Sequence, residues 1–165
     1  IRFGSGDWPG LSSKKLCTVY GSLVCSPEYL KKHPLDKLEQ LSQHKIITSS
    51  PNMDEWKPTF SEVINEKNKL VCDSYMASIK AASEGLGVAL GLFPITNSMV
   101  NSKVLCMPIN ILINTPFSYW VVNRQSPYQQ QTINKFFQWT QSLFNNLPPL
   151  NEEANIINME QLQDY

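Results

Sequence analysis

The sequence lacks a long apolar run and an excess of charge of either sign. No stretch approaches the roughly 18 consecutive apolar residues of a transmembrane helix, and no secretory signal pattern is recognisable. Lysine and arginine together number 14, as do aspartate and glutamate, so the formal net charge is zero. Because proteins that hold a phosphate backbone usually carry a basic excess, we do not expect this segment to bind nucleic acid. Because it has no long apolar run, we do not expect a membrane partner either.

Closely spaced cysteines are also missing. The four cysteines are Cys17, Cys25, Cys72 and Cys106, and no two of them form a C-x-x-C pair. At least three lie in apolar, strand-like runs, and a chain of 165 residues does not need disulfide bonds to fold. We interpret them as small buried hydrophobic residues in a reducing compartment rather than as bridges.

Sequence motifs of catalysis are absent as well. There is no G-x-S-x-G, no H-E-x-x-H, no P-loop and no G-x-G-x-x-G after a strand, and neither His33 nor His44 has a metal-like partner nearby. The sequence therefore predicts a protein that is not an enzyme, with no catalytic residue, no metal and no cofactor. A small hydrolase or transferase stays open as an alternative, but it needs a nucleophile–base pair that the sequence does not offer.

What is present is the composition of a globular α/β protein. Hydrophobic residues make up 42% and charged residues 17% of the chain, which suits one domain or two small lobes. Apolar, β-branched runs predict strands over residues 16–24, 45–48, 69–72, 87–90, 103–107 and 117–122. Helical patterns cover residues 27–32, 35–42, 55–65, 74–84 and 126–147, with a further start at Pro94 and a short helix in a polar tail. This alternation predicts largely parallel strand pairing.

Four strand-to-loop transitions are candidate binding segments, because ligands of open α/β sheets bind beyond the carboxyl ends of strands. Arg2 next to a Gly-rich turn suits a carboxylate, and three successive hydroxyl groups at residues 48–50 suit a small polar ligand. The residues that we expect to line the crevice are Arg2, Phe3, Gly4, Thr48, Ser49, Ser50, Asp73, Ser74, Leu92 and Phe93.

Each candidate also has a purely structural interpretation. The glycine-rich segment fits a tight turn in which Arg2 pairs with a local acid, and hydroxyl side chains are common in loops. Ser74 is a good N-cap for the helix that stops at Gly85, and Phe93 suits the core. Both interpretations stay open at the level of the sequence.

Several segments, taken in order, resemble LysR-type transcriptional regulators of the glycine-cleavage-activator and β-lactamase-activator branch. Residues 1–11 (IRFGSGDWPGL) resemble a signature of that branch, and residues 24–30 (VCSPEYL) match its Val-Cys-Ser-Pro segment. The remaining matches are residues 36–38, 44–47, Trp56, 73–75, 81–91, 119–122 and 136–139. The resemblance extends to about residue 147.

This resemblance implies the effector-binding domain of such a regulator, with a type 2 periplasmic-binding-protein-like α/β fold. Two lobes of mixed sheet flanked by helices are expected, with residues 26–113 as lobe II. Residues 1–25 and 114–147 then form the remainder of an incomplete lobe I, and residues 148–165 form a C-terminal tail. The chain is expected to cross between lobes at hinge positions Cys25, Ser26, Asn114 and Thr115.

The same resemblance implies the partners. The expected ligand is a small-molecule effector of the amino-acid, organic-acid or cell-wall-peptide class, bound by a cytoplasmic homodimer or homotetramer. Because the chain begins at Ile1, we expect a piece of a longer protein whose missing N-terminal helix-turn-helix alone contacts DNA. A periplasmic solute-binding protein of a transport system is the alternative, although free cysteines are unusual in that compartment.

Overall fold

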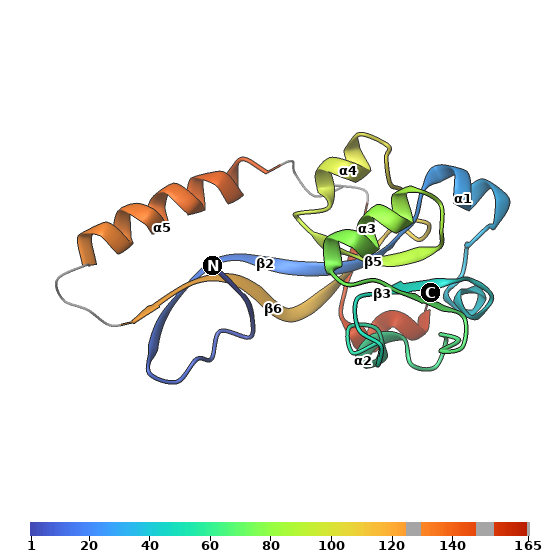
Figure 1. Cartoon of the computed structure of the whole chain (residues 1–165), viewed down its shortest axis with the longest axis horizontal. Helices are drawn as coiled ribbons and strands as arrows, with labels where there is room; N and C mark the ends of the chain where they lie inside the picture. The colour runs from blue at the N-terminus through green and yellow to red at the C-terminus, as the bar shows by residue number, and fades with distance from the viewer. Residues whose placement is uncertain (125–129, 148–153, 165) are drawn as a thin grey trace.

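The computed structural model describes residues 1–124, 130–147 and 154–164, and its centre is a seven-stranded mixed sheet (Figure 1). The strand order is β1-β6-β2-β5-β3-β4. The seventh strand, β7, pairs with residues 111–113 of β6, whereas β1 pairs with residues 118–120 of the same strand. The strands are β1 (Arg2–Gly4), β2 (Leu11–Val24), β3 (Ile46–Thr48), β4 (Lys69–Val71), β5 (Val88–Phe93), β6 (Ile111–Arg124) and β7 (Asn155–Ile157). The helices are α1 (Pro27–Lys32), α2 (Lys57–Phe60), α3 (Tyr75–Ser83), α4 (Asn97–Asn101) and α5 (Gln130–Asn145), with 3-10 helices η1 (Leu38–Gln43) and η3 (Met159–Asp164).

Two long antiparallel strands, β2 and β6, run through the whole molecule (Figure 1). At one end they carry β1 and α5, and at the other end they enter a compact body with β3, β4, β5 and α1–α4. Pairings β3–β4, β3–β5 and β6–β7 are parallel, whereas β1–β6, β2–β5 and β2–β6 are antiparallel. The expectation of largely parallel pairing is therefore wrong, because the two longest strands, β2 and β6, pair antiparallel with each other and each has a second antiparallel partner.

The sheet of the compact body is covered on both faces, and successive strand residues alternate between two cores. Leu23 and Ile46 belong to one cluster of buried side chains, whereas the next residues along each strand, Val24 and Ile47, belong to the other. This period of two is the geometry of a strand buried on both sides. It explains why these segments read as continuous apolar runs.

Local capping signals set the ends of α3. The Ser74 hydroxyl accepts a hydrogen bond from the backbone N–H of Ala77 (3.3 Å), and Gly85 follows the helix with a φ of 78°. A left-handed residue just beyond a helix is favoured when it is glycine. The helix predicted over residues 74–84 is thus confirmed.

Some predicted elements differ from the structure. Residues 103–107 form turns and bends and not a strand. Only Cys106 pairs with another backbone segment, through an isolated bridge to Cys25. The helices predicted over residues 35–42 and 55–65 are shorter, as η1 and α2, and the helix expected from Pro94 begins at Asn97. The predicted start of the long helix, residues 126–129, and its end at residues 148–149 lie outside the described residues, but α5 occupies most of the rest.

The C-terminal tail joins the compact body. The sequence pattern predicts a short helix there, but residues 155–157 form β7, which pairs in parallel with β6, and η3 follows. Ile157 and Leu162 are buried in the same core cluster as Trp56. These residues therefore belong to the folded core and not to a solvated tail.

The register between β2 and β6 is interrupted near the predicted lobe crossing. Thr18 pairs with Ser118, but Tyr20 pairs with Asn114, so that three residues of β6 lie opposite one of β2. The Thr115 hydroxyl donates a hydrogen bond to a carbonyl of β2 in this stretch (2.6 Å). Such bulges bend a strand and increase its twist locally.

The other two predicted hinge residues lie elsewhere. Cys25 is fully buried and pairs with Cys106, and Ser26 caps α1 by accepting a hydrogen bond from the N–H of Tyr29 (3.1 Å). The register therefore places residues 18–20 of β2, and not Cys25 and Ser26, opposite the Asn114 segment.

A buried histidine makes the stability of the compact body depend on pH. The ring Nδ1 of His44 lies 3.1 Å from the hydroxyl of Tyr29, and His44 is 5% exposed. Burial lowers the pKa of His44 below its usual value of about 6.5. The unfolded chain then binds the proton more readily, so the stabilising contribution is present above about pH 6.5 and is lost as the pH falls below it.

We expect the melting temperature to fall on going from pH 7.5 to pH 5.5 (both about one unit from that value), and to fall less in His44→Gln. Differential scanning fluorimetry at the two pH values measures this effect. His33→Gln is the comparison variant: this exposed histidine is only the last of the causes that lower the pKa of His44, so the variant is expected to keep most of the wild-type pH dependence. Equal pH dependence in His44→Gln and the wild type would contradict the assignment.

Candidate functional site

A pocket of about 220 Å³ lies at the carboxyl ends of β3 and β5, beside the start of α3. Its walls come from β1, from the β3–β5 sheet, from α3 and from the loop that follows β3. The lining residues are Phe3, Ile47, Ser49, Glu55, Trp56, Tyr75, Ser78, Leu90 and Leu92. Pockets at strand ends of an α/β sheet are the usual position for ligands in this architecture.

The carboxylate of Glu55 organises the loop after β3. Its Oε1 accepts hydrogen bonds from the Ser49 backbone N–H (2.7 Å), the Thr48 hydroxyl (2.6 Å) and the Ser49 hydroxyl (3.1 Å). Bonds to an ionised acceptor are short and strong, which explains why this loop closes on itself. The hydroxyl groups of Thr48 and Ser49 are therefore engaged within the protein.

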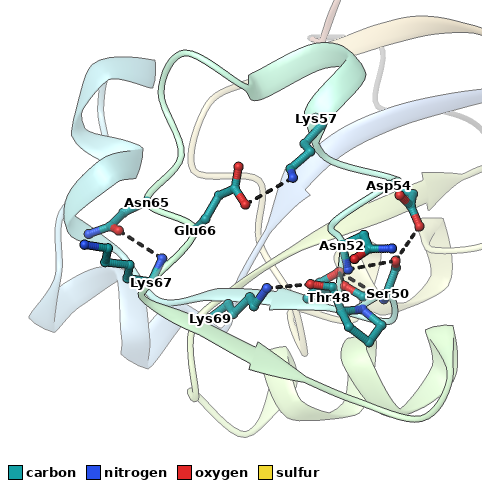
Figure 2. Close-up of polar contacts among 10 residues, drawn as sticks. Thr48, Ser50, Asn52, Asp54, Lys57, Asn65, Glu66, Lys67 and Lys69 are labelled. Atoms are coloured by element: carbon teal, nitrogen blue, oxygen red, sulfur yellow. Dashed lines mark hydrogen bonds and ion pairs between the residues drawn. The ribbon is translucent and has the colours of Figure 1, made fainter.

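The same loop is held from its outer side (Figure 2). The Ser50 hydroxyl donates to Asp54 Oδ2 (2.6 Å) and accepts from the Asn52 backbone N–H (3.3 Å). The Lys69 ammonium, from β4, donates to the carbonyl oxygen of Pro51. Ser50 thus points into the turn and away from the pocket wall.

A hydrogen-bonded chain fixes the opposite wall. The phenol oxygen of Tyr75 accepts from the Leu92 N–H (2.8 Å) and lies 3.0 Å from the Thr96 hydroxyl. The Thr96 hydroxyl donates to the Leu92 carbonyl (2.8 Å), so the Tyr75 hydroxyl donates to Thr96. Burial raises the pKa of Tyr75, which keeps the phenol neutral. Tyr75 therefore offers the pocket its ring and not its hydroxyl.

The pocket is mainly apolar and carries one negative charge. Ser78 donates its hydroxyl to the Ser74 carbonyl (3.2 Å), which leaves little polar surface on that side. Within the described part of the chain, Glu55 Oε2 has no hydrogen-bond partner, and no lysine or arginine lines the pocket. An unpaired carboxylate oxygen in an apolar surrounding favours a cation or a strong donor.

Of the residues predicted for the crevice, Phe3, Ser49 and Leu92 line the pocket. Thr48 lies directly behind Ser49 and is 1% exposed. These candidates come from three of the four predicted strand-to-loop segments; the remaining segment, residues 72–75, reaches the pocket through Tyr75 and not through Asp73 or Ser74.

The remaining predicted residues lie outside the lining. The Arg2 guanidinium stacks 5.8 Å from the centre of the Trp8 ring, and the Gly4 carbonyl accepts from the Trp120 indole N–H (3.0 Å). Asp73 is exposed. Phe93 is buried in the core cluster that contains α3 residues, on the opposite face of β5 from Leu92.

Sequence reasoning missed the residue that carries the charge of the pocket. Glu55 follows the hydroxyl-rich segment after a Pro-Asn pair. An acidic residue shortly after three hydroxyl side chains was the available sign that a carboxylate could accept hydrogen bonds from them. Trp56 was noted only through the resemblance, although it is fully buried and donates its indole N–H to the Ile47 carbonyl (3.1 Å).

The mixed sheet, its crossing strands and a pocket at the strand ends define a domain of the type 2 periplasmic-binding-protein fold. The effector domain of the transcriptional regulator AmpR of Pseudomonas aeruginosa superposes with a TM-score of 0.71 at 26% identity, over 87% of this chain and 70% of that one. The AmpR effector binding domain of Citrobacter freundii gives a TM-score of 0.73 at 23% identity, over 87% and 72%.

The model of the LysR substrate binding domain matches residues 1–145, and the chain belongs to this family. The glycine cleavage system transcriptional activator of Escherichia coli (strain K12) is 28% identical over 144 residues, which are 84% of this chain and 47% of that protein. The resemblance inferred from the motifs is thus confirmed. The chain spans about half the length of the curated relatives that it matches, and β7 and η3 lie beyond the matched residues.

Proposed function

We propose that this chain is the part of a transcriptional regulator that binds a small-molecule effector in the pocket at the ends of β3 and β5. The observation that carries the proposal is the origin of the lining: Phe3 comes from β1, whereas Ser49 and Leu92 come from the compact body. A ligand held between β1 and the compact body stabilises one arrangement of the two over another. A regulator needs such a ligand-dependent change of arrangement to transmit a signal.

The hinge of this motion is the irregular stretch of β2 and β6. We assign it to residues 18–20 together with Asn114 and Thr115, where the ladder is interrupted, and not to the buried pair Cys25 and Ser26. With the hinge at these residues, lobe II comprises residues 21–113, because Leu23 and Val24 pack in the cores of the compact body. Residues 1–17 and 116–147 belong to lobe I, and the boundary in β2 falls before residue 25, the position that the resemblance alone implies.

Lobe I has apolar surface that a further part of that lobe can cover. Phe136, Trp139 and Leu143 form an exposed stripe on α5, at 43%, 58% and 49% exposure. A helix with apolar residues on its outer face as well as against β2 suits a position between two layers. In the whole protein we assign that second layer to additional lobe I residues.

The relatives support regulation over transport or turnover. Those named above are transcriptional regulators or their effector domains, and the matched part of the Escherichia coli relative is about half of a longer protein. The proposed whole protein therefore binds DNA through a separate N-terminal helix-turn-helix, acts as a cytoplasmic homodimer or homotetramer, and binds its effector without chemical conversion. None of the helices in the described ranges is long and apolar enough to cross a bilayer.

Glu55 narrows the class of effector. The Ser49 N–H and the neighbouring hydroxyls already bind its Oε1, so they are not free for a ligand carboxylate. Its Oε2, which has no hydrogen-bond partner among the described residues, suits a protonated amine, and the apolar walls suit the body of the ligand. An amino compound, such as an amino acid or a cell-wall peptide, fits these features better than a simple organic acid.

Isothermal titration calorimetry with two matched probes tests this proposal. Phenethylamine and phenylpropionate share a benzene ring and a short chain but carry opposite charges. We expect phenethylamine to bind more tightly, and Glu55→Gln to weaken it about tenfold or more, because a charge-assisted hydrogen bond is lost.

The control variant is Glu62→Gln, the same change at an exposed residue outside the pocket, and it is expected to leave binding unchanged. Tighter binding of phenylpropionate would contradict the effector class but not the site. Phenethylamine binding that is equally tight in Glu55→Gln and in the wild type would contradict the site itself.

A further inference from the structure

Two cysteines far apart in the sequence face each other across an isolated bridge. Cys25 donates its N–H to the Cys106 carbonyl (3.1 Å), and Cys106 donates its N–H to the Cys25 carbonyl (2.8 Å). Such a reciprocal antiparallel pair has a Cα–Cα distance of about 5.5 Å, which lies inside the range of disulfide bonds. The two sulfur atoms are 3.9 Å apart.

The two thiols differ in exposure and acidity. Cys25 is fully buried, whereas Cys106 is half-buried. The hydrogen bond from the Cys25 thiol lowers the pKa of Cys106, while that bond and burial raise the pKa of Cys25. Cys106 is therefore the more accessible of the two thiols and the more readily ionised to the reactive thiolate. The Cys25 sulfur, 3.9 Å away, is placed to attack an oxidised Cys106.

We propose that Cys25 and Cys106 form a peroxide-oxidisable dithiol that closes to an intrachain disulfide. The Cys106 thiolate attacks the O–O bond of a hydroperoxide, takes one oxygen to become a sulfenic acid, and releases the alcohol, or water in the case of hydrogen peroxide. The Cys25 thiol then attacks the sulfenic sulfur; the S–S bond forms, the S–O bond breaks and water leaves. Over both steps the dithiol loses two hydrogen atoms and the peroxide is reduced.

Closure needs little rearrangement of the backbone, because the hydrogen bonds of the bridge already align both chains. The sulfur atoms must approach from 3.9 Å to about 2.05 Å, which side-chain rotation can supply. The new bond joins residues 81 apart in sequence and encloses all the elements from α1 to α4. Because a long closed loop restricts the unfolded chain, oxidation is expected to raise the melting temperature by about 5–15 °C.

The test uses the chain with Cys17→Ser and Cys72→Ser, which leaves the proposed pair as its only cysteines. The protein is treated with stoichiometric hydrogen peroxide, blocked with iodoacetamide and examined by intact mass, non-reducing peptide mapping and thermal melting. We expect the loss of two hydrogen atoms, one linked peptide that joins Cys25 to Cys106, the higher melting temperature, and reversal of all three by dithiothreitol.

Adding Cys25→Ser removes the resolving thiol and is expected to leave a sulfenic acid at Cys106 that dimedone traps. If this variant fails to fold, the peptide map of the pair-only protein still decides the question. The proposal is overturned if both thiols remain open to alkylation after peroxide. Linked peptides between two copies of the chain would overturn it as well.

Discussion

Trp56→Ala is expected to destabilise the chain by about 3–5 kcal/mol, because a fully buried indole is removed from the core. The ring packs against Phe60 with centroids 5.6 Å apart, and its N–H donates to the Ile47 carbonyl (3.1 Å). The substitution opens a cavity beside the pocket and removes the hydrogen bond between the indole and that carbonyl, which adds to the cost. Chemical denaturation followed by circular dichroism measures the change in the free energy of unfolding.

Two variants separate the contributions to this effect. Trp139→Ala makes the same change at a residue that is 58% exposed and is expected to cost about 0.5 kcal/mol or less. Trp56→Phe keeps most of the apolar contact but loses the N–H donor, so an intermediate cost of about 1–3 kcal/mol is expected. Equal costs for Trp56→Ala and Trp139→Ala would show that the loop after β3 is not packed as described.

Ile157→Ala is expected to cost about 2–5 kcal/mol, although this residue lies beyond the part of the chain that matches the family. Ile157 is 6% exposed, pairs with Ile113 of β6 and packs in the core cluster that contains Trp56. Its loss removes apolar contact where β7 closes the edge of the sheet. Chemical denaturation followed by circular dichroism measures the change in the free energy of unfolding.

The neighbouring residue provides the matched control. Ile156 lies in the same strand but faces solvent, at 56% exposure, so Ile156→Ala is expected to cost less than about 1 kcal/mol. A similar small cost for both variants would mean that β7 does not contribute to the core. A large cost for Ile156→Ala alone would reverse the assigned faces of the strand.

The elements with local signals could be predicted from the sequence. The cap at Ser74 and the stop at Gly85 define α3, and the apolar runs define most of the strands. The apolar run over residues 103–107 fails as a strand because a strand also needs a partner, and only Cys106 has one. Partner choice depends on residues distant in sequence, so antiparallel pairing and the docking of β7 could not be derived from local patterns.

The binding site could be predicted in part for a similar reason. The rule that ligands bind at strand ends found Ser49 and Leu92, but adjacent strand residues point to opposite faces, so Phe93 faces the core. Glu55 depends on how the loop after β3 closes, which only the folded structure shows. The glycine-rich segment places Phe3 at the pocket, whereas Arg2 stacks on Trp8.

The central claim is that a small molecule binds between β1 and the compact body. An NMR titration of the ¹⁵N-labelled chain with phenethylamine tests it most directly. We expect the largest shift changes at the backbone amides of Ser49 and Leu92 and at the indole N–H of Trp56, because all three border the pocket. Changes confined to the separate surface pocket at Asn114, Asn158 and Glu160, with these three signals unmoved, would contradict the claim.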